Sequence, residues 1–240
     1  ALQSITGAFS LVLLTNDSLI GVRDPFGIRP LVLGKLNDTY ILSSESCGLD
    51  IIGADLIRDV EPGEILIIKN NKIDSIKPFK KTYLRPCLFE YIYFSRPDSI
   101  LEGRNVYDVR KSIGHQLAVE NPNDNEIIDV VIPIPDSGNA SALGYSEKIK
   151  KPFEFGIIRN HYTGRTFIED SISVRNLSVK LKHNPNIFSF KNKSIALVDD
   201  SIVRGTTSVK IVEMLRNCGV KNVHMRIASP PVKHPCFYGI

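Results

Sequence analysis

One stretch, LVDDSIVRGTTS from Leu197 to Ser208, constrains the fold of this chain more than any other. It overlaps a short apolar run, Ser194 to Val198, of the kind that forms a buried parallel strand. Farther on, apolar residues recur at helical spacing, at Ile211, Met214, Leu215 and Cys218. Gly219 then provides a helix stop. The stretch therefore predicts a strand, a turn and a helix, the unit from which α/β folds with parallel sheets are built.

Two carboxylates, Asp199 and Asp200, stand at the predicted carboxyl end of this strand, where open α/β sheets bind their ligands. The turn that follows them is rich in phosphate-binding groups: Arg204, Gly205, Thr206, Thr207 and Ser208. Carboxylates can hold sugar hydroxyls or a hard cation such as magnesium. An acidic pair alone would also fit a solvated turn, but together with this cradle it predicts a site for a phosphorylated sugar.

Composition excludes few functions. A chain of 240 residues can form one large domain or two small ones, and a net charge of +4 without a basic block fits anionic small molecules as well as nucleic acid. No apolar run approaches the roughly 20 residues that a membrane helix needs. The four cysteines are far apart, without a disulfide-framework spacing. We therefore expect a cytoplasmic protein that does not bind a membrane. The sequence shows neither a helix-turn-helix pattern nor a basic sheet studded with aromatic residues, so we expect no nucleic-acid partner.

Residues 1–77 are predicted to form a layered antiparallel sheet with little helix. Short apolar runs alternate there with turn sequences; the predicted strands are 8–14, 19–23, 31–33, 40–42 and 65–68. Residues 78–103 are predicted to be a connector, because Pro78, Pro86 and Pro97 interrupt any long helix. Within this connector, Phe89 to Phe94 is predicted to be a short aromatic strand.

Residues 104–240 alternate between helical and strand patterns, which favours a parallel sheet. The predicted helices are 105–120 and 141–150, and the predicted strands, besides the one described above, are 127–134, 153–158 and 222–228. A polar segment from Arg159 to about Lys191 separates two of these strands. A loop of this length inside a compact domain is uncommon and is usually functional.

Several of these strings resemble known families. RDPFGIRPL, SSESCGLD and RDVEPGEI, within residues 23–65, resemble the later half of class II glutamine amidotransferase domains, where we expect Asp24 and Arg29 to form a buried ion pair that fixes a turn. LVDDSIVRGTTS resembles the phosphoribosylpyrophosphate (PRPP) signature of type I phosphoribosyltransferases. CLFEYIYFSRPDS, from Cys87 to Ser99, resembles the inter-domain segment of the glutamine PRPP amidotransferase family.

The resemblance implies an α/β fold in two parts. Residues 1–77 would be the C-terminal half of an Ntn-hydrolase-like amidotransferase sheet, 78–103 the connector, and 104–240 a type I phosphoribosyltransferase domain that is incomplete at its C-terminus. The family's glutamine-cleaving cysteine is N-terminal, whereas this chain begins with Ala1. We therefore expect the chain to be the middle of a longer protein and to lack glutaminase activity on its own.

The resemblance also implies a PRPP site made of three loops. In the first, Asp199, Asp200 and Ser201 would hold the ribose, and residues 204–208 the phosphate. In the second, Asp136, Ser137 and Gly138 of the PDSG turn would hold the pyrophosphate, and Ser137 would join Asp199 and Asp200 around magnesium. In the third, RNHYTGRTFI resembles the family's flexible catalytic loop, although it departs from the usual pattern at three positions. Its catalytic residues would be Arg159, Tyr162 and Arg165.

The reaction implied by the resemblance is displacement of pyrophosphate from PRPP by glutamine-derived ammonia, which forms phosphoribosylamine in the first step of purine biosynthesis. The family further implies homo-oligomers and purine nucleotides as feedback inhibitors. Two other functions stay open. One is a phosphoribosyltransferase with a nucleobase acceptor, which would lack the amidotransferase-like strings; the other is a non-catalytic regulator that binds PRPP.

Two cysteines have a second implied role. Some family members carry a four-iron, four-sulfur cluster, with ligands in the inter-domain segment, in a His-Pro-Cys-Phe-Tyr-Gly string and in a C-terminal Cys-x-x-Cys. Cys87 and Cys236 occupy the first two of these positions. Alternatively, Cys87 and Cys236 are small side chains buried beside aromatic rings, as free cysteines commonly are. A four-iron cluster also needs four thiolate ligands, and these two residues would provide only two.

Overall fold

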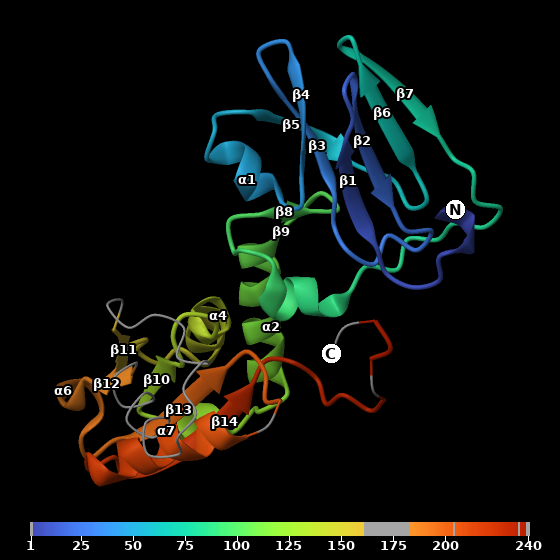
Figure 1. Cartoon of the computed structure of the whole chain (residues 1–240). Coiled ribbons are helices and arrows are strands. Elements are labelled where there is room, and N and C mark those ends of the chain that lie inside the picture. Colours follow the sequence, from blue (N-terminus) through green and yellow to red (C-terminus); the bar gives the residue numbers. More distant parts are fainter. Residues whose placement is uncertain (1, 161–182, 204, 235, 239–240) are drawn as a thin grey trace, which may run out of the picture. The chain divides into compact units, whose positions relative to one another are not determined.

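The computed structural model describes residues 2–160, 183–203, 205–234 and 236–238, which form two compact units (Figure 1). The first unit comprises Ala1–Tyr107 and Val232–Ile240, and the second comprises Asp108–Pro231. The finer division into a partial amidotransferase domain, a connector and a transferase domain stays a prediction. The described part of the chain contains no helix that is both long and apolar enough to cross a membrane.

Among the described residues, the first unit contains two larger antiparallel sheets and a two-stranded antiparallel pair. One has the order β1 (Ser10–Leu14), β2 (Ser18–Arg23), β6 (Ile65–Lys69) and β7 (Lys72–Ile76), and the other has the order β4 (Thr39–Ser43), β3 (Val32–Leu36) and β5 (Asp55–Asp59). Leu33 of β3 and Leu66 of β6 belong to one buried cluster, so the sheets pack against each other. The predicted layered sheet is confirmed. The prediction missed β5, β7, the short 3-10 helix Leu2–Ser4 and α1 (Ser46–Asp50).

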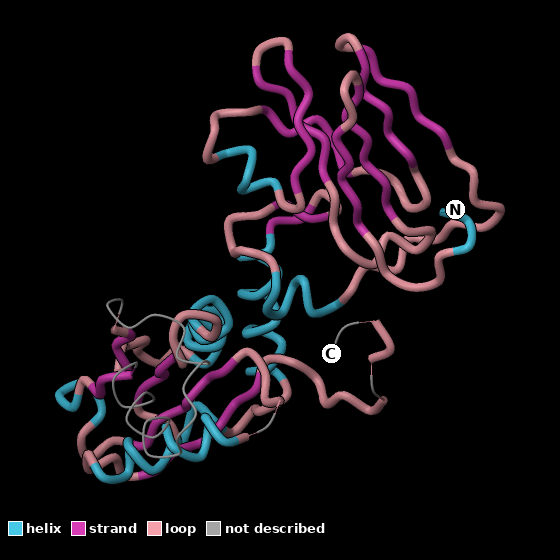
Figure 2. The backbone as a smooth tube through the Cα atoms, viewed as in Figure 1, coloured by secondary structure: helices cyan, strands magenta, loops and turns pink. Residues whose placement is uncertain are grey.

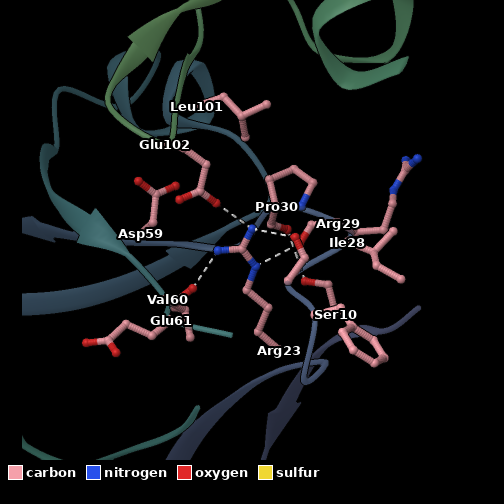
Figure 3. Close-up of polar contacts among 12 residues, drawn as sticks. Ser10, Arg23, Ile28, Arg29, Pro30, Asp59, Val60, Glu61, Leu101 and Glu102 are labelled. Atoms are coloured by element: carbon pink, nitrogen blue, oxygen red, sulfur yellow. Dashed lines mark hydrogen bonds and ion pairs between the residues drawn. The ribbon is translucent and has the colours of Figure 1, made fainter. Parts of the chain in front are cut away.

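A buried arginine joins several loops of this unit (Figure 3). The side chain of Arg23 is only 1% exposed. Its guanidinium donates hydrogen bonds of 2.6–2.9 Å to three carbonyl oxygens, those of Gly27, Arg29 and Val60. It also forms an ion pair of 2.7 Å with Glu102, in the turn between β8 (Ile100–Leu101) and β9 (Arg104–Asn105). Arg23 therefore satisfies backbone acceptors that burial would otherwise leave without partners.

The expected ion pair between Asp24 and Arg29 is wrong. The Asp24 carboxylate instead accepts hydrogen bonds from the backbone N–H groups of Phe26 at 2.8 Å and Ile28 at 3.1 Å. Arg29 pairs with Glu90, with its Nε 3.0 Å from a carboxylate oxygen. Asp24 does fix the turn, but it acts through backbone donors, as short acidic side chains commonly do.

The predicted aromatic strand at Phe89–Phe94 is also wrong, because Glu90–Phe94 forms a π-helix. Arg29 pairs with Glu90 and stacks on the ring of Phe94, 4.7 Å from its centroid. In a strand these two partners would be about 13 Å apart along the chain, at roughly 3.3 Å per residue. Only a helical turn brings both to one guanidinium, so this tertiary contact overrides the strand propensity of the aromatic residues.

The second unit is built on a parallel sheet. Its order is β10 (Val130–Pro133), β13 (Ser194–Asp199) and β14 (Asn222–Ile227). The helices are α2 (Val106–Val119), α3 (Asp124–Ile127), α4 (Asn139–Ile149), α6 (Ile187–Phe190) and α7 (Thr206–Asn217). This confirms the predicted alternation of helices and strands. The strand predicted at 153–158 is shorter and later, as β11 (Ile157–Arg159), and pairs antiparallel with β12 (His183–Pro185).

Helices cover both faces of the parallel sheet (Figure 2). Every residue of β13 is buried, and the side chains alternate between the faces. Ala196 and Val198 pack with residues of α2 and α4, whereas Ile195 and Leu197 pack with residues of α7. Burial on both sides explains why the sequence of this strand is continuously apolar. The same packing holds the carboxyl end of β13 in place, and the acidic pair begins at that end.

Candidate functional site

Two of the predicted loops meet at the carboxyl edge of the parallel sheet. Strands β10 and β13 pair in parallel, with Pro133 opposite Val198, so the segments after them start side by side. The Ile134 N–H continues the pairing with a 2.8 Å hydrogen bond to the Val198 carbonyl. The Ser137 hydroxyl then donates to a carboxylate oxygen of Asp200 at 2.8 Å. The structure therefore joins the PDSG turn to the acidic pair.

The PDSG turn has a backbone shape that demands glycine at its end. A Cβ atom on Gly138 would lie 2.6 Å from the carbonyl oxygen of Val198 and 2.8 Å from that of Ile134. No side chain fits there, so the turn lies directly on the sheet edge and runs into α4. The peptide bond between Pro135 and Asp136 is cis.

The acidic pair is buried, with Asp199 9% and Asp200 5% exposed. The Asp200 N–H donates to the Asp199 carboxylate at 3.0 Å, and the Ser201 hydroxyl donates to Asp200 at 2.9 Å. Burial, followed by the neighbouring Asp200 carboxyl, raises the pKa of Asp199 to about 8. The two neighbouring carboxyl groups form an oxygen-rich site suited to a cation or to hydroxyl groups.

A helix N-terminus completes this edge. Gly205 is the N-cap of α7 with a φ of +72°, and Thr206, Thr207 and Ser208 form the first helical turn. The N–H groups of a first turn have no acceptor within the helix, so they can bind an anion. The left-handed backbone at Gly205 explains why glycine precedes the hydroxyl residues. Arg204 lies outside the described residues.

The third loop is only partly described. Arg159, at the end of β11, forms an ion pair with the Asp136 carboxylate, so its guanidinium lies beside the PDSG turn. Tyr162 and Arg165 lie outside the described residues. The structure therefore brings together one residue of this loop, the PDSG turn and the acidic pair. The roles assigned to these residues stay predictions.

A buried polar network that the sequence analysis missed joins three elements of the same unit. Arg226 of β14 donates two hydrogen bonds of 2.6 Å to Asp124 of α3, and the Tyr145 hydroxyl of α4 donates to the same carboxylate. Burial alone would raise the pKa of Asp124, but these bonds hold it below its usual range. No local motif marks the three residues, because they are far apart in the sequence and only the fold brings them together.

The two cysteines proposed as cluster ligands differ in exposure. Both are in the first unit, where Cys87 is half-buried and Cys236 is exposed. Within the described ranges, no group of three or more histidine, cysteine or acidic residues could hold a metal ion. A cluster at this place would therefore need thiolates beyond the described residues.

Comparisons with known proteins identify relatives of this chain. The phosphoribosyl transferase domain family matches residues 98–229. The chain is 53% identical to an amidophosphoribosyltransferase of Rhizobium etli over 100% of its own length and 49% of that protein. It is 45% identical to that of Archaeoglobus fulgidus, covering 99% of this chain and 51% of that protein.

A solved structure of an amidotransferase is also similar to this chain in its fold. Glutamine PRPP amidotransferase from B. subtilis, complexed with ADP and GMP, superimposes with a TM-score of 0.90 at 45% identity, covering 98% of this chain and 51% of that one. The chain thus spans about half the length of the relatives that it matches. Because the family match extends over more than half of the chain, the protein belongs to the phosphoribosyl transferase family.

Proposed function

We propose that the protein that contains this chain is an amidophosphoribosyltransferase, which forms phosphoribosylamine and pyrophosphate from PRPP and ammonia. One observation carries the proposal: the Ser137–Asp200 hydrogen bond of 2.8 Å joins two loops suited to the two ends of PRPP. Similarity to amidophosphoribosyltransferases along the whole chain supports ammonia, rather than a nucleobase, as the acceptor of the phosphoribosyl group.

In this reaction the nitrogen of ammonia attacks the anomeric carbon of PRPP while the bond from that carbon to the pyrophosphate oxygen breaks. Pyrophosphate leaves with the bonding electron pair, and the new ammonium group then loses a proton to solvent. The PDSG turn, with Asp136, Ser137 and Gly138, would hold the pyrophosphate. Residues 205–208 would hold the 5-phosphate, as backbone N–H groups do at helix N-termini.

Magnesium fits the residues at this edge. Ser137, Asp199 and Asp200 offer oxygen ligands, and Mg²⁺ commonly binds through one or two carboxylates together with the phosphates of its substrate. Burial and the neighbouring Asp200 carboxyl raise the pKa of Asp199, and a bound cation would favour its ionised form. When bound, magnesium would offset the negative charge that accumulates on the leaving pyrophosphate. Arg159, beside Asp136, would add a second positive charge there.

The first unit would serve the supply of ammonia. We propose that it is part of a class II amidotransferase domain that hydrolyses glutamine, and that the chain alone does not catalyse this step. The B. subtilis relative was solved with ADP and GMP, so we also propose that purine nucleotides inhibit the enzyme as feedback regulators. We further propose that the full-length protein forms a homo-oligomer and is located in the cytoplasm.

An iron–sulfur cluster in the full-length protein stays a prediction that rests on Cys87 and Cys236. Visible absorption and the iron content of protein purified without oxygen would test it. Four iron atoms per chain that are lost in Cys236→Ser would support the ligand role. Iron-free protein with full activity would exclude a required cluster.

Assays of pyrophosphate release by the full-length protein would test the proposed reaction. We expect release with PRPP, magnesium and either glutamine or ammonia. Release that requires hypoxanthine or guanine would identify a nucleobase phosphoribosyltransferase instead. Binding of PRPP without turnover of any acceptor would identify a non-catalytic regulator.

A further inference from the structure

Two glycines bring α2 and α4 into direct backbone contact. A Cβ atom at Gly114 of α2 would lie 1.9 Å from the carbonyl oxygen of Ser141 on α4. At Gly144 of α4, a Cβ atom would lie 2.0 Å from the carbonyl oxygen of Lys111 on α2. Real Cβ atoms essentially never approach within 3.0 Å, so alanine at either position must separate the helices by about 1 Å.

Helix α4 cannot move away easily, because it also packs on the sheet. Ala142 and Tyr145 are fully buried and belong to the same cluster as Val131, Ala196 and Val198 of the strands. Protein interiors are close-packed, so the sheet does not compress to accept the helix. An added methyl group at Gly114 must therefore shift α4 from its present position on the sheet.

The strongest overlap at Gly114 is with the end of α4 that carries the PDSG turn, and a weaker one is with the backbone N of Tyr145 at 2.9 Å. Ser141, which Gly114 contacts, lies in the first turn of α4, and Gly138 is the N-cap of that helix. Gly138 in turn lies against the Val198 carbonyl, and Ser137 donates to Asp200 at 2.8 Å. A movement at Ser141 is therefore passed within one helical turn to the groups that face Asp200.

We infer that the close packing of α2 on Ser141, made by the contact at Gly114 and by the Ser141 hydroxyl bond to the Arg110 carbonyl, positions the PDSG turn for the pyrophosphate of the substrate, so Gly114 is a positioning residue of the reaction. This inference rests on the proposed function of that turn. Gly144 lies one helical turn beyond Ser141. Its close contact is with Lys111, so it holds the same two helices together at a point farther from the PDSG turn. Misplacement of about 1 Å at a positioning element can cost up to about 100-fold in rate.

The test compares Gly114→Ala with Gly144→Ala in the full-length protein. The two substitutions create nearly equal overlaps, so we expect similar losses of thermal stability. Isothermal titration with inorganic pyrophosphate and magnesium should show affinity at least about 10-fold weaker in Gly114→Ala and within about 3-fold of wild type in Gly144→Ala. The KM for PRPP should follow the same order.

A ribose 5-phosphate titration provides a second readout, because the cradle at residues 205–208 is not attached to α4. Its affinity should stay within about 3-fold of wild type in both variants. Equal changes in both glycine variants, or unchanged pyrophosphate affinity in a folded Gly114→Ala, would overturn the inference.

If Gly114→Ala does not fold, Ser141→Ala carries the test. This change removes the 3.1 Å hydrogen bond from the Ser141 hydroxyl to the Arg110 carbonyl without adding volume. Pyrophosphate affinity reduced by about 3-fold or more would support the inference, and unchanged affinity would refute it. A wild-type protein that binds neither pyrophosphate nor PRPP would instead refute the proposed function, and the inference with it.

Discussion

Two buried carboxylates, one in each unit, have opposite kinds of neighbours. Glu64 of the first unit is 1% exposed and accepts hydrogen bonds from Arg58 at 2.7 and 2.8 Å and from Ser75 at 2.6 Å. Burial alone would raise the pKa of Glu64, but these bonds lower it to about 2. In the second unit, burial and the neighbour Asp200 raise the pKa of Asp199 to about 8.

The difference teaches how to separate scaffold from site in this chain. A buried carboxylate with its own cation is fully satisfied and has no capacity left for a ligand. A buried carboxylate beside another carboxylate is unsatisfied in its ionised form, and such groups concentrate at functional sites. Asp124, which is held by Arg226, shows that this is a property of the neighbours and not of the unit.

The largest effect should come from removing a scaffold cation. Arg23→Leu would leave Glu102 without its partner and three carbonyl oxygens without their donor, at a cost of about 3–5 kcal/mol of unfolding free energy. Urea unfolding followed by circular dichroism measures this. The control is Arg96→Leu, which breaks a solvent-exposed ion pair with Asp98 and should leave the unfolding free energy close to that of wild type. Equal losses of unfolding free energy in both variants would contradict the view that the buried Arg23 matters more than an exposed ion pair.

At the candidate site the expected loss is in activity and not in stability. Asp200→Asn should reduce PRPP turnover by the full-length protein about 100-fold, the order seen when one polar group of a preorganised site is lost. Glutamine hydrolysis should continue, because we assign it to the amidotransferase domain that contains the first unit, whereas Asp200 lies in the second unit. Asp98→Asn, at an exposed ion pair, is the matched control and should turn over PRPP at the wild-type rate. An unchanged rate in Asp200→Asn would remove Asp200 from the site.

The contribution of Glu64 to the unfolding free energy should depend on pH. Because the folded-state pKa of Glu64 lies below its ordinary value of 4.5, the stability that it contributes is complete above about pH 4.5 and is lost as the pH falls toward 2. Glu64→Gln should cost about 2 kcal/mol at pH 7, and this difference from wild type should shrink across that window. Unfolding curves at several pH values would show whether it does. A difference that is constant with pH would contradict the assignment.

The smallest effect should come from Asp199→Asn on stability without ligands. The substitution resembles the protonated form that the raised pKa favours, so unfolding free energy at pH 7 should change by less than about 1 kcal/mol. This is the sharpest contrast with Glu64→Gln, which makes the same chemical change at a satisfied carboxylate. Thermal unfolding of both variants side by side provides the comparison. A loss at Asp199 as large as that at Glu64 would make the acidic pair part of the scaffold.

The sequence by itself determined the local elements of the second unit. The apolar run before Asp199, the glycine at 205 and the helical spacing after it predicted β13 and α7, and the structure has both. Such signals are readable because strand and helix periods, caps and turns depend on residues that are neighbours in the chain. The same reasoning failed at residues 89–94, where Arg29 decides the conformation from a distant loop.

Only the tertiary structure decided which distant residues meet. The hydrogen bond between Ser137 and Asp200, the network around Asp124 and the contact of Gly114 with Ser141 each join residues from different elements. No periodicity encodes these pairs, because they depend on sheet register and helix packing, which the whole core sets at once. Sequence patterns thus identified the parts of the candidate site, and packing placed them side by side.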